Sequence, residues 1–228
     1  MNLVLETRSL GVRLGRTQAL NSVDLHIRDL GHVIGLFGQN GAGKTTLLRV
    51  LAGLVNRYSG EITVPDNGVA YLPDESFLPG FLKIEELLGL GRDLFSDFDG
   101  TVAQDIFSTL NLRTGMRLSE ASRGMLEQIH LGFVLARRSS LYLFDEPLAA
   151  VDPLTRDKLI DMIGKFRNSG STVIISTHLI GGLESLFDEA IVIHDGRIVL
   201  HDNVEDIASQ GGLEGRFKEI MRNYDLVD

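Results

Sequence analysis

The feature that most constrains the fold of this chain is the run Gly38–Thr46, which reads GQNGAGKTT. It follows the apolar run Val33–Phe37 and precedes a helix-like run, Leu47–Ala52. The pattern G-x-x-x-x-G-K-T between a strand and a helix is typical of a loop that binds phosphate groups. The sequence therefore predicts an α/β fold in which a buried strand delivers this loop to a phosphate-bearing ligand.

The residue types in this loop explain how it can hold a triphosphate. Gly38, Gly41 and Gly43 have no Cβ atom, so the backbone can curl and point successive N–H groups at anionic oxygens. The N-terminus of the following helix adds partial positive charge. We expect Lys44 to reach the β- and γ-phosphates and the Thr45 hydroxyl to bind Mg²⁺. The other candidate nucleotide contacts in the loop are Asn40, Ala42 and Thr46.

A flexible glycine turn before a helix is the alternative interpretation of this run. We favour the phosphate-binding loop because the strand and the helix that the pattern requires are both in place.

The composition limits the class of protein. The 228 residues are 43% hydrophobic and 23% charged, enough for one large domain or two small lobes. A net charge of −9 argues against a nucleic-acid partner, which would favour a basic face. The chain has no cysteine, no signal-peptide pattern and no apolar run near the ~20 residues of a membrane span. We therefore expect a cytoplasmic protein whose membrane role would come through a partner.

The first half of the chain changes its periodicity once. Residues 1–30, 61–64 and 69–72 have the alternation or short apolar runs of β-strands, with a turn at 58–60. From residue 76 the apolar residues fall at helical spacings, as in Ile84, Leu87 and Leu88. Ser122 is a candidate N-cap for a helix that ends in Arg137 and Arg138. We predict a mainly helical lobe over 76–138, inserted in an α/β core of residues 1–75 and 139–228.

The second half returns to an α/β pattern. Strands are predicted over 141–144 and 172–176, helices after Asp152–Pro153 and around 183–187, and a hairpin over 190–194 and 197–200. A C-terminal amphipathic segment has one apolar face, made of Leu213, Phe217, Ile220, Met221 and Tyr224. We expect this face to pack on the core and not to bind a partner. The fold class is α/β: a P-loop NTPase core with a mixed sheet, flanking helices and an N-terminal antiparallel β part.

Two strand ends carry further candidate chemistry. Asp145 ends an apolar strand that we expect next to the loop, and its carboxylate suits Mg²⁺. Glu146 follows it and can orient or deprotonate the attacking water. His178 ends another apolar strand, at the edge where open α/β sheets bind ligands, and can hydrogen-bond the γ-phosphate.

Together these residues resemble the nucleotide-binding subunits of ABC transporters over nearly the whole chain. The match covers Gly38–Thr45, Asp145–Glu146, Asp152 and His178, in the order of that family. The resemblance implies that two such subunits sandwich two ATP molecules. Each site would combine the phosphate loop of one chain with the signature sequence of the other, and would energise a separate transmembrane permease at the inner face of the membrane.

The signature sequence departs from the family pattern LSGGQ. The matching register is Ala121–Met125, in which Ser122 and Gly124 survive. The alternative register, Leu118–Glu120, lacks the glycine and has the wrong spacing. The resemblance implies that Ser122 and Gly124 face the γ-phosphate held by the partner chain.

Two positions around the nucleotide also depart from the family. Asp74 stands where the family has glutamine, so a carboxylate is expected beside Mg²⁺. Leu14 stands near the position of the adenine-stacking aromatic ring, which predicts weak discrimination between ATP and GTP.

Two further stretches bear on partners. Phe77–Phe81 is either a local core cluster or the wall of a groove for a permease helix. Phe95–Asp99 and the short C-terminus resemble exporters of the antibiotic- and peptide-response type.

The sequence therefore favours an ATP-hydrolysing subunit of an ABC transporter that works as a dimer. A slow or regulatory ATP switch is the alternative, motivated by Asp74, Leu14 and the altered signature. A nucleic-acid-handling ATPase of this family is disfavoured, because the chain is acidic and has neither a coiled-coil insertion nor a second ATPase domain.

Overall fold

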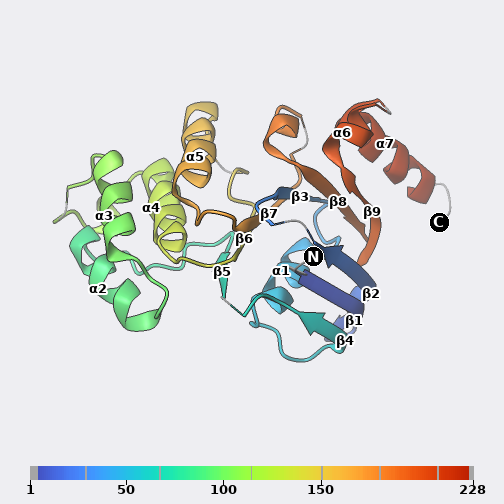
Figure 1. Ribbon diagram of the computed structural model, residues 1–228, viewed down its shortest axis with the longest axis horizontal. Helices are drawn as coiled ribbons and strands as arrows, with labels where there is room; N and C mark the ends of the chain where they lie inside the picture. Colours follow the sequence, from blue (N-terminus) through green and yellow to red (C-terminus); the bar gives the residue numbers. More distant parts are fainter. Residues whose placement is uncertain are drawn as a thin grey trace.

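Two β-sheets with helices around them make up the molecule (Figure 1). The computed structural model describes residues 5–28, 30–66, 68–113, 115–149, 151–179, 181–209 and 211–225. Within these residues no helix is long and apolar enough to cross a membrane.

The main sheet has six strands, and the predicted apolar runs supply its centre. In spatial order they are β5 (Val69–Leu72), β6 (Leu141–Asp145), β7 (Thr172–Thr177), β3 (Val33–Phe37), β8 (Glu189–His194) and β9 (Arg197–Asn203). β5, β6, β7, β3 and β8 are parallel, and β9 pairs antiparallel with β8 in the predicted hairpin. The end of β6 lies next to the loop, as expected, because Asp145 accepts from the Thr45 hydroxyl. The two strands are not paired with each other, since β7 lies between β6 and β3.

The predicted N-terminal β part forms a separate antiparallel sheet. Its spatial order is β2 (Thr17–Ile27), β1 (Leu5–Leu14) and β4 (Ser59–Thr63). The predicted turn at 58–60 is only partly right, since Ser59 and Gly60 already belong to β4. This sheet lies beside helix α1 (Lys44–Leu51), which begins directly at the glycine-rich loop (Figure 1).

The main sheet is buried on both faces, which explains its continuous apolar strands. Because neighbouring residues of a strand point to opposite faces, Ile34 and Leu36 pack with α1 and the small sheet. Val33 and Phe37 pack in the core on the opposite face, which includes residues of α2–α7. The strand that leads to the loop is therefore fixed from both sides.

Helices dominate the segment between β5 and β6, as predicted. They are α2 (Ile84–Leu94), α3 (Gly100–Thr109), the short 3₁₀ turn η1 (Leu118–Glu120) and α4 (Arg123–Leu135). Figure 1 shows α2 and α3 at one end of the molecule, far from the C-terminal helices. The Ser122 side chain caps α4 by accepting from the Met125 N–H, so the predicted cap is confirmed. The division of 76–138 from the core as its own unit stays a prediction.

The end of α4 differs from the prediction. The helix ends at Leu135, so Arg137 and Arg138 lie beyond it and do not close its last turn. Arg137 instead forms a two-pronged pair with Asp97, at 3.0 Å from each carboxylate oxygen. Although burial opposes it, this pairing lowers the pKa of Asp97. Arg138 donates to the Phe166 carbonyl. Both arginine side chains therefore bind residues that are distant in the sequence and do not interact with the end of α4.

The C-terminal third contains α5 (Pro153–Phe166), α6 (Val204–Ala208) and α7 (Gly212–Asp225). The predicted helix around 183–187 is only the 3₁₀ turn η2 (Glu184–Leu186), because one turn is too short for an α-helix to be stable by itself. Leu213, Ile220 and Met221 of α7 are buried in the core and Phe217 packs against it, which confirms the predicted apolar face at these four positions. Tyr224, predicted on the same face, is instead 42% exposed and contacts the ring of His194.

Candidate nucleotide-binding site

The glycine-rich loop is held tightly between β3 and α1. Gly43 caps α1 with φ 112°, and a Cβ atom there would lie 2.7 Å from the Ala19 carbonyl oxygen. A Cβ atom at Gly38 would lie 2.5 Å from the Ile193 carbonyl oxygen. The Gly196 N–H in the turn between β8 and β9 donates to the Ala42 carbonyl at 2.9 Å. Only glycine fits at Gly38 and Gly43, because the backbone of the loop packs directly against the carbonyl groups of neighbouring segments.

A cavity of about 440 Å³ opens over this loop. Its lining combines the loop with residues far away in the sequence: Leu14, Thr17, Ala19, Gln39, Asn40, Gly41, Gly43, Lys44, Thr45, Thr46, Asp74 and Glu146. Cavities of this size accept small-molecule ligands. The structure thus brings Leu14 and Asp74 to the loop, as the sequence predicted, and leaves Leu14 51% exposed at the edge.

Lys44 folds back over the loop. Its Nζ atom donates to the Gly38 carbonyl at 2.7 Å and to the Gln39 carbonyl at 3.3 Å. The same atom lies 3.3 Å from Glu146 Oε1. The ammonium group is almost fully buried, so its charge is directed into the cavity, where phosphate oxygens can replace these acceptors.

Asp145, at the end of β6, contacts Thr45 in the first turn of α1, although β6 is not paired with β3, the strand that leads to the loop. Asp145 Oδ1 accepts from the Thr45 hydroxyl at 3.1 Å and from the Ser176 hydroxyl at 2.6 Å. Its Oδ2 accepts from the Tyr71 hydroxyl at 3.2 Å. Burial raises the pKa of Asp145, and the nearby Asp74 charge acts in the same direction.

Sequence reasoning missed Tyr71 and Ser176 as partners of Asp145. Burial raises the pKa of Tyr71 to about 12, so its hydroxyl stays a donor at neutral pH. A signal was available for Tyr71: a tyrosine in an apolar strand needs a partner for its hydroxyl.

Glu146 occupies an unusual backbone conformation directly after β6. Its φ of 48° is in the left-handed region, which is strained for glutamate and is often found at functional sites. Its Oε2 lies 3.0 Å from His178 Nδ1. Its Oε1 is buried and accepts no hydrogen bond within the described part of the chain. The charged neighbour of this oxygen is Lys44 Nζ, at 3.3 Å. If phosphate oxygens took over Lys44, Oε1 would be free to orient a water molecule.

The described residues contain no group of three acidic, histidine or cysteine side chains that could hold a metal by themselves. Mg²⁺ usually binds through one or two protein oxygens plus substrate phosphates. The Thr45 hydroxyl and the Asp145 carboxylate, in contact with each other at the cavity, fit that requirement.

The remaining predicted site residues do not line this cavity. Ser122 caps α4, and Asp152 caps α5 by accepting from Thr155. The Thr155 hydrogen bonds lower the pKa of Asp152. A Cβ atom at Gly124 would lie 3.1 Å from Thr155 Oγ1, so the two helix N-termini lie side by side.

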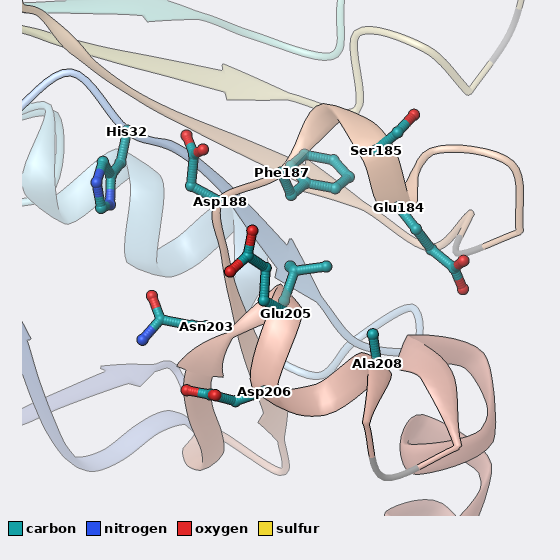
Figure 2. Close-up of a pocket in the computed structure, with 10 residues that line it drawn as sticks. His32, Glu184, Ser185, Phe187, Asp188, Asn203, Glu205, Asp206 and Ala208 are labelled. Atoms are coloured by element: carbon teal, nitrogen blue, oxygen red, sulfur yellow. The ribbon is translucent and has the colours of Figure 1, made fainter.

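A second cavity, of about 700 Å³, lies at the opposite, amino-terminal ends of β3 and β8 (Figure 2). Figure 2 shows His32 and Asp188 on one side and Glu205 and Asp206 of α6 on the other. Its carboxylates disfavour phosphate, and Asp188 is already bound to the Val33 N–H. The cavity over the loop is therefore the candidate nucleotide site.

Comparisons with known proteins identify the family of this chain. Residues 20–149 match the family model described as ABC transporter. The chain is 34% identical to an aliphatic sulfonates import ATP-binding protein of Rhodococcus jostii, over 94% of this chain and 88% of that protein. It is 29% identical to an uncharacterized ABC transporter ATP-binding protein of Methanocaldococcus jannaschii, over 89% of this chain and 79% of that protein.

A solved structure has the same fold. A structure titled as the ATP binding subunit of an ABC transporter superposes with a TM-score of 0.82 at 24% identity, over 96% of this chain and 99% of that one.

Proposed function

This chain belongs to the ABC transporter family, as an ATP-binding subunit that energises transport, and we propose how its residues carry out ATP hydrolysis. ATP enters the cavity with its base at Leu14 and its phosphates on the loop from Gly38 to Thr46. Lys44 exchanges the loop carbonyls and Glu146 for β- and γ-phosphate oxygens. The ion pair between Lys44 and Glu146 inside this cavity carries the proposal, because it brings the phosphate-binding cation and the candidate base together.

Thr45 and Asp145 would hold Mg²⁺, with Asp74 at its flank directly or through water. The ion would neutralise charge on the triphosphate. Ser176 and Tyr71 fix both oxygens of Asp145, so its carboxylate is already oriented. Such preorganisation lowers the cost of reaching the reactive geometry.

Glu146 would orient the attacking water and accept its proton. His178 holds Glu146 Oε2 at 3.0 Å and, when the γ-phosphate is present, can donate to it instead. The water then meets Oε1, the carboxylate oxygen without a hydrogen bond among the described residues.

A second subunit would complete the site. The N-terminus of α4, with Ser122 as its cap and Gly124 in its first turn, is not part of the cavity in the same chain. A 13-residue helix offers partial positive charge and free N–H groups to an anion. We propose that it faces the γ-phosphate held by the partner, with Asp152 in the adjoining interface. No nucleic acid is involved.

The permease contact is proposed at the start of the helical segment. Phe81 is 67% exposed, whereas Phe77 is 38% exposed and packs on the rings of His130 and Phe133. The two alternatives for this stretch therefore apply to different residues. Phe81→Ser should weaken co-purification with the permease and leave the melting temperature unchanged, whereas Phe77→Ser should lower the melting temperature. The chain would sit at the inner face of the membrane through this contact.

Export is proposed from the resemblance of Phe95–Asp99 alone. The names of similar proteins include both directions of transport: the sulfonate protein above is named for import, and a Nod factor ATP-binding protein is named for export. The fold also gives these residues other roles, because Asp97 pairs with Arg137 and Asp99 caps α3. Substrate accumulation in inside-out vesicles that contain the permease would support export, and depletion would support import.

The slow or regulatory switch is the second candidate function. The Asp74 carboxylate in the cavity favours it, because it adds negative charge beside the triphosphate. Turnover of the purified chain separates the two: a switch binds ATP and dimerises but hydrolyses little.

The first experiment is ATP binding and hydrolysis by the purified chain, compared with Lys44→Ala. Lys218→Ala removes an exposed lysine of α7 and is the control. We expect Lys44→Ala to lose ATP binding while Lys218→Ala retains it. Equal ATP affinity in all three proteins would overturn the proposed site.

A further inference from the structure

Arg49 lies on the same face of α1 as Thr45. The two residues are four positions apart in the helix, which places their side chains one above the other. Arg49 Nη2 lies 3.8 Å from Asp74 Oδ1 at the edge of the cavity. The Tyr71 side chain on β5 lies beside the guanidinium and raises the pKa of Arg49. Arg49 therefore touches two residues of the magnesium flank and is not part of the phosphate loop.

Tyr71 links this arginine to the candidate metal carboxylate. Its hydroxyl donates to Asp145 Oδ2 at 3.2 Å. Arg49 on α1 thus lies beside the tyrosine of β5 that hydrogen-bonds the carboxylate at the end of β6. A hydrogen bond of this kind orients the carboxylate that accepts it.

The charges at this flank need a counter-charge. Three carboxylates, Asp74, Asp145 and Glu146, lie around a cavity that is to receive a triphosphate. Lys44 is engaged with the loop and with Glu146. Arg49 is the cation that meets Asp74, the carboxylate that replaces a neutral amide in this chain.

We infer that Arg49 is a positioning residue of the magnesium flank, which holds Asp74 directly and Asp145 through Tyr71. It thereby offsets the charge that Asp74 adds beside the triphosphate. This inference rests on the proposed nucleotide site. Its physical consequence is specific: without Arg49, metal-free ATP, which carries more negative charge than the Mg²⁺ complex, meets an uncompensated carboxylate.

The experiment measures ATP affinity by calorimetry, once with Mg²⁺ and once with EDTA. Arg49→Met should weaken metal-free binding about threefold to fivefold more than binding with Mg²⁺. The ratio of the two dissociation constants therefore rises. Adding Asp74→Asn to the same chain removes the uncompensated charge and should return the ratio to the parental value. Arg49→Lys should keep the ratio, because it keeps the charge.

A merely structural arginine would weaken both affinities equally, and this outcome would overturn the inference. So would a ratio that Asp74→Asn fails to restore. Tyr71→Phe should give part of the same rise, and an unchanged ratio would remove the link to Asp145. Arg216→Met, which removes a surface arginine of α7 paired with Glu219, is the matched control and should leave the ratio unchanged.

Thermal melting checks that each variant is folded. The Arg49–Asp74 pair is exposed on both sides, so its loss should change stability little. Failure of the parental chain to bind ATP at all would instead contradict the proposed function, which keeps the two failures distinct.

Discussion

Glu146 Oε1 lies 3.3 Å from Lys44 Nζ, so the candidate base and the phosphate-binding cation neutralise each other. Both groups must part when a triphosphate occupies the loop, because its oxygens compete for the same ammonium. Glu146 is held in place by its left-handed backbone and by His178. We therefore expect Glu146 to stay at the cavity when Lys44 turns to the phosphates, so that nucleotide entry would align the base.

Replacing Glu146 by glutamine removes the proton acceptor and preserves the shape of the side chain. We expect kcat for ATP hydrolysis to fall by about 10²- to 10⁴-fold, with ATP binding retained. Steady-state phosphate release and calorimetric ATP binding measure the two effects. A Glu146→Gln chain that hydrolyses ATP at the parental rate would assign the base elsewhere.

The base end of the cavity should be poorly selective, because Leu14 offers apolar contact and no aromatic ring. Leu14→Tyr should strengthen the binding of both ATP and GTP by about tenfold, in the range of one stacking interaction, because both bases have a π-face. Competition binding with the two nucleotides gives each affinity and the ratio of ATP to GTP affinity in the parental chain. Leu154→Tyr is the control, since Leu154 is 74% exposed and does not line the cavity. Tight ATP selectivity in the parental chain would contradict this role of Leu14.

His130 predicts a stability change at mildly acidic pH. Burial lowers the pKa of His130 to about 4, below its ordinary value of 6.5. The unfolded chain therefore binds a proton between these values while the folded chain does not, so stability is complete above pH 6.5 and is lost as the pH falls toward 4.

Relative to His130→Gln, the parental free energy of unfolding should fall by about 2–3 kcal/mol across this window. Urea unfolding at several pH values, for both proteins, provides the comparison. Parallel pH profiles would show that another group is responsible. Ser76 Oγ lies 3.3 Å from His130 Nε2 and can also hydrogen-bond the side-chain amide of a glutamine at this position.

Local pattern was enough to predict the strands and the loop. The runs at Val33 and Leu141 are apolar throughout, so burial on both faces followed directly. The order of the strands did not follow, because no local signal says that β7 separates β6 from β3. Thr45 still contacts Asp145, since α1 starts at the end of β3 and packs across the sheet as far as β6.

Long-range partners explain what the sequence could not predict. The position of Arg137 in the sequence predicts a cation at a helix end, but its guanidinium pairs with Asp97, forty residues earlier. The apolar pair Leu183 and Phe187 has helical spacing, but only one 3₁₀ turn forms between them. No motif in the sequence points to Arg49 or Tyr71. Their positions beside the candidate site become visible only in the fold, where α1, β5 and β6 come together. The roles of the site residues themselves stay predictions.

The most direct test of the composite ATP site is the association state of the Glu146→Gln chain, measured by sedimentation velocity. The account predicts a monomer without nucleotide and a dimer with ATP. Adding Gly124→Asp places a carboxylate where the partner's γ-phosphate is expected, and should abolish the dimer while thermal melting shows a folded chain. A chain that stays monomeric at saturating ATP, or an ATP-bound dimer that survives Gly124→Asp, would contradict the account.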